Sequence, residues 1–227
     1  SIMLSEVFAA GLGYVIGWAA LRSFIRQTGL TFVVLTSLPA GAAIWVFCAA
    51  WLQALPILYS PSYPSVIACV IAAWLSFKSH LAVEKYEAVA FVVGLCMIGV
   101  LTMVFSIIDV TTVGSDDFWT IYMANEIQLH GRFSTDTRFL LLSKEPLFQA
   151  LIQSGAPAFG KAYFTALQPL FGILAIAVFL VLTYQSLHAT GVTCFTAKTI
   201  SLAAAVAVAT TPIVIVHALT FKTHGIF

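Results

Sequence analysis

Two adjacent carboxylates, Asp116 and Asp117, are the side chains of this sequence best placed for chemistry. Six of the nine acidic residues lie between Asp109 and Lys161, and the chain on either side of this stretch is apolar. A carboxylate in such a place can accept a proton in a reaction. Two acids that follow Ser115 can equally cap a helix and compensate its dipole. Both interpretations are open from these residues alone.

A short helix is expected to position the acidic pair. Ser115 suits the N-cap and Gly131 suits the position after the last helical residue, which predicts a helix over residues 116–130. Its apolar side chains form a stripe, so we expect it to lie along the membrane surface. The stripe comprises Phe118, Ile121, Tyr122 and Leu129. A polar turn follows, and Pro146 then suits the first turn of a second interfacial helix.

Composition identifies the broad class of the protein. The chain is 61% hydrophobic and 8% charged, with a mean hydropathy of +1.02, whereas soluble proteins average about 25% charged residues. We therefore expect an integral membrane protein. The net charge of +1 and the lack of any basic run exclude a nucleic-acid partner.

Six apolar runs predict membrane spans, since a helix of about 20 apolar residues crosses a hydrocarbon core about 30 Å thick. They cover residues 4–21, 30–53, 65–77, 88–108, 162–187 and 199–220. The third run is the shortest and reaches a spanning length only if Lys78 extends toward the membrane surface. Because the runs lack the two-residue alternation of barrel strands, the predicted fold class is an all-α polytopic transmembrane bundle.

The distribution of Lys and Arg predicts the orientation. With the first terminus outside, five of these residues fall in short inner connections, which favours that orientation. They are Arg22, Arg26, Lys78, Lys85 and Lys198. Lys161, beside the fifth span, argues against it. We expect a plasma (inner) membrane protein with loop 109–161 extracytoplasmic, divided into three N-terminal spans in residues 1–87 and a core in residues 88–227.

The loop carries a longer pattern as well. Asp116-Asp117 is followed by Tyr122, Ala124, Glu126-Ile127, Gly131 and Phe133, and then by Lys144-Glu145-Pro146-Leu147-Phe148. This order resembles the first extracytoplasmic loop of the GT-C glycosyltransferases, most closely the protein mannosyltransferase and aminoarabinose transferase branch. The run Thr211 to Thr220 is similar to the third helix of that core.

The pattern also departs from the family. Asp117 stands where those enzymes often have Glu, Glu145 replaces the first of two prolines, and Lys222-Thr223-His224 lacks an acid found there. The resemblance covers about residues 88–227. We expect the chain to be part of a longer protein whose later helices complete the donor cavity.

The resemblance implies an activity and a site. It implies inverting transfer of a hexosyl or pentosyl group from a polyprenyl-phosphate donor to a glycan, lipid or protein acceptor, with Asp116 as general base. Asp117 would orient Asp116 or the acceptor, or bind a divalent cation; no other cofactor is expected. The implied substrate-binding residues are Tyr122, Arg132, Arg138, Lys144 and Glu145. Lys144, Arg132 or Arg138 would neutralise the lipid phosphate, and the same cations can instead contact lipid headgroups.

Two other function classes are compatible with the sequence. A noncatalytic transmembrane subunit of a larger membrane complex would use the apolar helices as scaffold, with Gly13-x-x-x-Gly17 supporting helix packing. A transporter fragment would need interrupted helices or ionisable groups near the bilayer centre. His217 and the prolines Pro39, Pro169 and Pro212 are the features that could serve it. The five histidines lack metal-ligand spacing, so no zinc site is expected.

Overall fold

The computed structural model of the protein describes residues 2–54, 62–78, 84–108, 167–212 and 214–215. These residues form helices, with no strand in the described ranges, so the predicted all-α bundle is confirmed. In chain order they are α1 (Ile2–Leu21), the 3-10 turn η1 (Arg22–Phe24), α2 (Ile25–Thr28), α3 (Leu30–Ala54), α4 (Ser62–Lys78), α5 (Lys85–Ile108), α9 (Leu167–Ala189) and α10 (Cys194–Ala209).

The described helices have the lengths and composition of membrane spans. Four segments are long and apolar enough to cross a bilayer: Glu6–Thr28, Leu30–Ala49, Lys85–Ile108 and Pro169–Ala189. Two shorter apolar helices, Tyr63–Phe77 and Cys194–Ala209, accompany them. The protein is thus an integral membrane protein. Each of the six predicted runs contains one of these helices, α1, α3, α4, α5, α9 or α10, but α4 and α10 are shorter than the four candidate spans.

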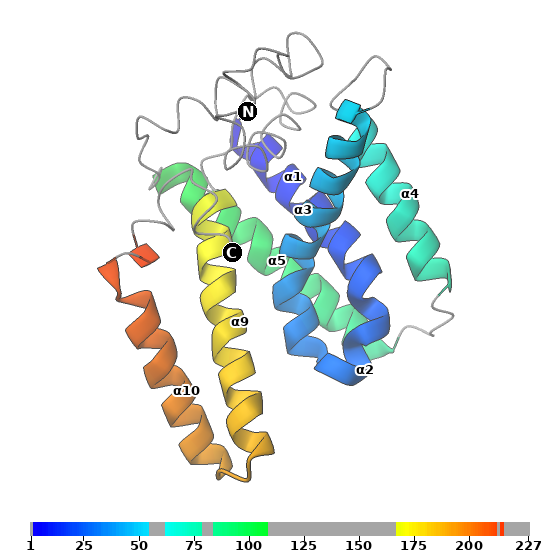
Figure 1. The fold of residues 1–227 in the computed structure, drawn as a ribbon. Coiled ribbons are helices and arrows are strands. Elements are labelled where there is room, and N and C mark those ends of the chain that lie inside the picture. Colours follow the sequence, from blue (N-terminus) through cyan, green and yellow to red (C-terminus); the bar gives the residue numbers. More distant parts are fainter. Residues whose placement is uncertain (1, 55–61, 79–83, 109–166, 213, 216–227) are drawn as a thin grey trace.

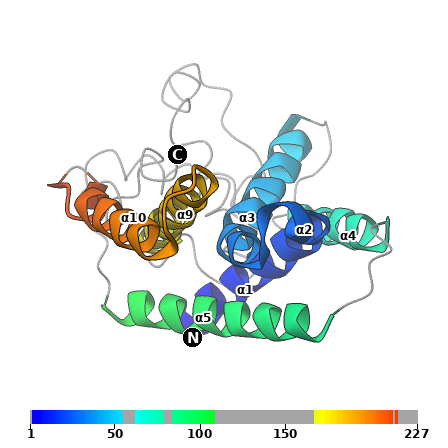
Figure 2. The ribbon, with the colours of Figure 1, turned by 90° about the horizontal axis from the view of Figure 1, so that it is seen from below.

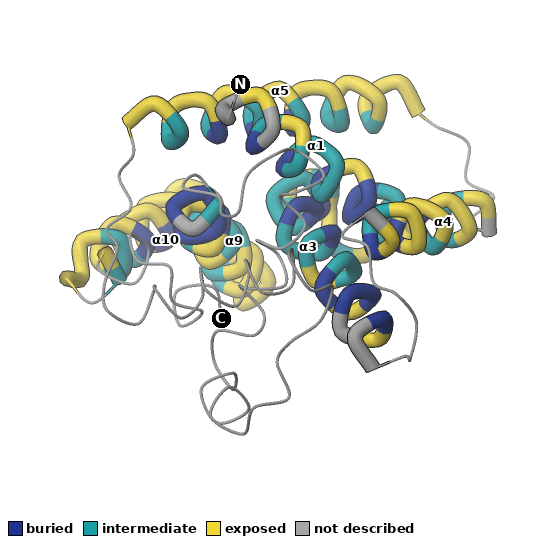
Figure 3. The backbone as a smooth tube through the Cα atoms, turned by 90° about the horizontal axis from the view of Figure 1, so that it is seen from above, coloured by how far each residue is buried: buried dark blue, intermediate teal, exposed yellow. Residues whose placement is uncertain are grey.

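The helices pack around α1 and α3. Helix α1 contacts α3, α4 and α5, while α9 packs on α3 and α5 and carries α10 on its other side. Figure 2 shows α4 and α10 at opposite edges of the bundle, with α5 along one side. Exposed residues cover much of α4, α10 and the outer side of α5 (Figure 3). These apolar surfaces are suited to lipid contact.

Glycines bring the backbones of α1 and α3 into contact. A Cβ atom added at Gly41 would overlap the carbonyl oxygen of Gly13, and one added at Gly17 would overlap the carbonyl oxygen of Ser37. We call these four residues the glycine contact. Small residues spaced four apart allow this approach in membranes, where close packing drives helix association. The predicted packing role of Gly13 and Gly17 is confirmed, with α3 as the partner helix.

Two glycines and two side-chain hydrogen bonds shape the connections between helices. Gly29, with φ of 88°, separates α2 from α3, and Gly191, with φ of 84°, forms the turn between α9 and α10. Both need the left-handed backbone region that glycine adopts readily. Thr193 then caps α10 by accepting from the Thr196 backbone N–H at 3.4 Å. Gln185 Nε2 donates to the Thr28 carbonyl oxygen at 3.2 Å, which ties α9 to α2.

The last span differs from its prediction. Residues 199–220 were expected to form one helix, but α10 begins earlier, at Cys194, and ends at Ala209. Pro212 has no backbone N–H to continue the ladder. The Val208 carbonyl accepts from the Thr211 backbone N–H at 3.1 Å instead. The hydroxyls of Thr210 and Thr211 donate to the Val206 and Ala207 carbonyls, at 2.8 and 2.9 Å. Side chains thus satisfy the carbonyls at the end of α10.

The glycine contact predicts a position-specific loss of stability. Gly41→Ala should destabilise the bundle by about 1–3 kcal/mol, because the new methyl group forces α1 and α3 apart. The measurement is the free energy of unfolding in mixed detergent micelles. Gly99→Ala is the matched control, since its Cβ would meet only Val7 Cγ1 at 3.9 Å. Equal stability of the two variants would contradict the glycine contact.

Candidate functional site

The sequence-predicted site lies outside the described residues. This applies to Asp116 and Asp117 and to the five predicted substrate-binding residues, Tyr122, Arg132, Arg138, Lys144 and Glu145. His217 lies outside them as well. Their roles and the interfacial helices of loop 109–161 stay predictions. The described helices nevertheless establish where that segment connects to the bundle.

The segment containing the predicted site joins the end of α5 to the start of α9. These two helix ends lie at the same end of the bundle as the start of α1 (Figure 1). The η1–α2 segment, the start of α5 and the α9–α10 turn lie at the other end (Figure 1). Arg22, Arg26 and Lys85 belong to these elements, so the described basic connections are separated from the two helix ends that flank residues 109–166.

An antiparallel seam between α1 and α5 joins the two ends of the bundle. Its centre is aromatic: Phe91 of α5 lies 5.6 Å from Tyr14 and 5.4 Å from Trp18 between ring centroids. Trp18 meets Phe91 edge-on, with 62° between the ring planes. Gly94 makes room for Tyr14, because a Cβ there would lie 2.8 Å from the Tyr14 Cζ atom. Edge-on aromatic contacts of this kind add to the stabilisation from burial.

An ion pair closes the seam at the basic end of the bundle. Arg22 Nε lies 3.5 Å from Glu87 Oε2, and the two side chains are 10% and 12% exposed. The pair links η1, directly after α1, to the first turn of α5. Charges at a membrane boundary are tolerated when they are paired and partly hydrated, so this interaction suits the border of the hydrocarbon layer.

A buried carboxyl lies near the other end of the seam. Glu6 of α1 is 1% exposed, and Thr102 of α5 is fully buried. The Thr102 hydroxyl donates to the Ile98 carbonyl at 2.7 Å. Sequence analysis missed Glu6, although its signal was available: it is an acid within the otherwise apolar run Ile2–Leu21. Ionisable residues inside membrane spans commonly mark functional sites.

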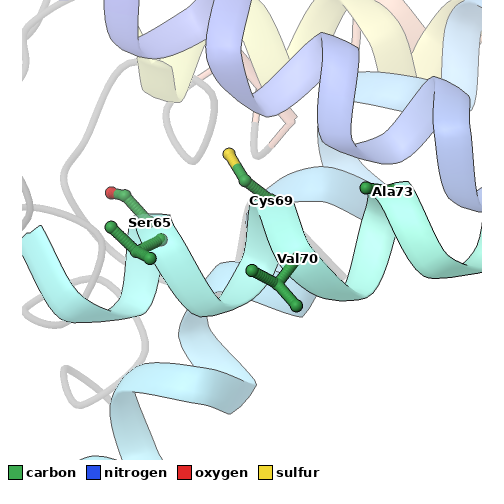
Figure 4. Close-up of a pocket in the computed structure, with 5 residues that line it drawn as sticks. Ser65, Cys69, Val70 and Ala73 are labelled. Carbon is green, nitrogen blue, oxygen red and sulfur yellow. The ribbon is translucent and has the colours of Figure 1, made fainter.

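The other polar features of the described helices are a groove on α4 and single hydrogen bonds between helices. No group of three His, Cys, Asp or Glu in these helices is arranged to hold a metal ion. An open groove of about 370 Å³ lies on α4, lined by Ser65, Val66, Cys69, Val70 and Ala73 (Figure 4). None of its lining side chains is charged. Ser65 Oγ accepts from Trp45 Nε1 at 2.9 Å, so it joins α4 to α3.

Comparison with known proteins identifies no relative of this chain. No protein-family model, curated protein or solved structure matches the chain. The resemblance to GT-C glycosyltransferases therefore depends on the order of residues in the loop and on the membrane-helical fold. The chain is shown to be a polytopic membrane protein, and its activity is a matter for proposal.

The Arg22–Glu87 pair should show a measurable coupling energy. In a double-mutant cycle of Arg22→Gln and Glu87→Gln, we expect about 1 kcal/mol of coupling, because the pair is largely shielded from solvent. The measurement is the unfolding free energy of the four proteins in detergent. The same cycle with exposed Arg26 in place of Arg22 is the control and should give coupling near zero. Equal coupling in both cycles would show that the Arg22–Glu87 contact has no specific role.

Proposed function

We propose that the chain is part of a GT-C type glycosyltransferase that moves a sugar from a polyprenyl-phosphate donor to an extracytoplasmic acceptor. One observation carries the proposal: the order Asp116-Asp117, Tyr122, Gly131 and Lys144-Glu145-Pro146 in a segment between two apolar helices. This order, and not any single residue, resembles the family. The polytopic helical fold is the setting that such an enzyme requires.

The arrangement of the helices supports the proposed orientation. Helices α5 and α9 flank the loop at one end of the bundle, and the described basic connections lie at the other (Figure 1). Cytoplasmic connections of membrane proteins are enriched in Lys and Arg. We therefore assign the η1–α2 end to the cytoplasm and loop 109–161 to the outer side of the plasma (inner) membrane.

The proposed reaction needs one base. The acceptor hydroxyl attacks the anomeric carbon of the donor sugar, a new carbon–oxygen bond forms, and the bond to the polyprenyl-phosphate oxygen breaks with inversion. The hydroxyl proton passes to the carboxylate of Asp116. Polyprenyl phosphate leaves as an anion, so no second carboxyl group has to protonate the departing oxygen, in contrast to glycoside hydrolysis.

The remaining loop residues have supporting roles in this proposal. Asp117 orients Asp116 or the acceptor, or binds a divalent cation. Lys144, with Arg132 or Arg138, neutralises the phosphate of the donor. Tyr122 and Glu145 contact the substrates. The acceptor is a glycan, a lipid or a protein, and the enzyme acts in the cell envelope.

The two alternative functions, a transporter and a noncatalytic subunit, require different features of the helices. A transporter would use broken helices near the bilayer centre. Helix α3 runs without interruption from Leu30 to Ala54 through Pro39, whereas α10 ends at Ala209, before Pro212. A noncatalytic subunit would use the bundle as a scaffold within a larger membrane complex. That alternative predicts that loop carboxylates can be replaced without loss of activity.

The orientation can be tested with one native and one introduced cysteine. Cys194 is exposed at the start of α10, at the basic end of the bundle. In intact cells, a membrane-impermeant maleimide should label Ser134→Cys in the loop and should label Cys194 only after permeabilisation. Mass spectrometry of the labelled peptides gives the result. Labelling of Cys194 but not of residue 134 from outside would reverse the assignment.

The catalytic proposal can be tested by removing the base. In the full-length protein in nanodiscs, Asp116→Asn should lower kcat for sugar transfer by about 10²- to 10⁴-fold, because the amide cannot accept the proton. Transfer is measured with radiolabelled polyprenyl-phosphate sugars. Asp136→Asn, a change in the same loop at an acid without an assigned role, should retain activity. If Asp116→Asn transferred sugar at the wild-type rate, the assignment of Asp116 as the general base would be wrong.

A further inference from the structure

The groove on the outer face of α4 has a regular floor and a regular wall. Ser65, Cys69 and Ala73 recur every four residues, so they form one row along the helix. Figure 4 shows these three side chains along the same edge of α4. Val66 and Val70 form a second row beside them and are 60% and 62% exposed. The groove is therefore an apolar strip that follows the helix axis.

Small residues spaced four apart make close helix contacts elsewhere in this bundle. Gly13 and Gly17 of α1 meet α3 in the glycine contact. Helix α10, which packs on α9, has buried residues with the same spacing, Ala197, Ser201 and Ala205. In a bilayer such rows let backbones approach, and close packing then drives association. The row on α4 thus has the form of a helix-packing surface.

Helix α4 uses a different face to attach to its own bundle. Ala68 and Ala72 are buried and pack in a cluster with Ile16 of α1 and Cys48 of α3. Cys69 and Ala73, one position farther along in each case, are exposed, so none of the described helices covers their row. Figure 2 places α4 at the edge of the bundle. A second protein in the membrane can therefore reach this row.

The short length of α4 gives a physical reason for such a contact. Its apolar segment, Tyr63–Phe77, is about 21 Å long at the rise of an α-helix, whereas the hydrocarbon core is about 30 Å thick. A span shorter than the bilayer thins it locally, extends flanking side chains to the interface or oligomerises. Contact with another protein replaces part of the mismatched lipid boundary of α4, which stabilises the assembled state.

A second copy of this chain fits the groove for reasons of charge and symmetry. No lining side chain is charged, so two copies of the groove can meet without repulsion. Copies in one membrane share an orientation, since the distribution of Lys and Arg sets it. Their α4 helices are therefore parallel, and a two-fold axis along the membrane normal brings the row of one copy against the same row of the other. Cys69, the middle residue of the row, then lies opposite Cys69 of the second copy.

We propose that the α4 groove is the contact surface of a homodimer in which two parallel α4 helices cross at Cys69. The row of Ser65, Cys69 and Ala73 allows the close approach, and Val66 and Val70 of each copy pack beside the row of the other. This dimer does not depend on the proposed glycosyl transfer.

Oxidative cross-linking of native cysteines in membranes tests the crossing point. Cys69 on α4 and Cys96 on α5 are both exposed within apolar helices. In the full-length protein carrying Cys194→Ala, copper phenanthroline should join two copies through Cys69, because a disulfide needs Cα atoms within about 7 Å. Adding Cys69→Ala should abolish the dimer band on a non-reducing gel, whereas adding Cys96→Ala, the matched control, should retain it. Equal loss in both variants, or loss with Cys96→Ala alone, overturns the proposal.

A substitution that fills the groove tests the surface without cysteine chemistry. In the full-length protein, Ala73→Leu should weaken association by about 10- to 100-fold, because the added carbons overpack a close contact. Energy transfer between labelled copies in liposomes, measured as the protein is diluted with lipid, gives the association constant. Ala203→Leu, at an exposed alanine of α10, is the matched control and should leave association unchanged. Both variants should keep the wild-type melting temperature in detergent that separates the copies, since both positions are exposed in a single copy.

The proposal requires both results. If the protein stays monomeric in liposomes, the groove holds a lipid chain or a further helix of the same protein, and the proposal is wrong. A dimer that Ala73→Leu does not weaken forms through another face, which overturns the proposal as well.

Discussion

Backbone contact between α1 and α3 is the interaction on which the rest of the bundle depends. Apolar helices in a bilayer gain little from hiding their side chains from lipid, so close packing must hold them together. Gly13, Gly17, Ser37 and Gly41 provide that packing by removing side-chain volume where the helices cross. The other helices attach to this pair, since α4 and α5 contact α1, and α9 contacts α3.

The seam between α1 and α5 shows how the protein distributes polarity through a membrane. Its centre consists of aromatic and small residues, and its polar groups lie toward the ends. Arg22 and Glu87 pair where water and headgroups reduce the cost of charge. Glu6 is different, because it is buried inside a span.

Catalysis at a membrane surface places two conflicting demands on a protein. The lipid-linked donor requires an apolar bundle, and proton transfer requires carboxylates that keep contact with polar surroundings. In the proposed transferase, the loop between α5 and α9 supplies the reacting acids and the helices supply the support.

Much of the architecture was predictable from the sequence because the bilayer imposes a simple rule. A backbone in hydrocarbon must satisfy its own hydrogen bonds, so each apolar run of sufficient length becomes a helix. Six apolar helices, four of them long enough to cross a bilayer, and the all-α class followed from this rule. Helix ends were less predictable: the break after α10 depends on Thr210, Thr211 and Pro212, whose local hydrogen bonds outweigh the hydropathy of residues 199–220.

By itself, the sequence determined the membrane class, the helical spans and the acidic loop as the place to look for chemistry, because these follow from composition and local order. Only the tertiary structure decided which helices touch. The spacing of Gly13 and Gly17 predicted close packing against another helix. Only the packing shows that Ser37 and Gly41 of α3 are the partners. From the sequence Glu6 is an acid in an apolar run, and only the packing of α1 shows that it is buried. Burial and facing partners depend on residues distant in the chain, and no local pattern encodes them.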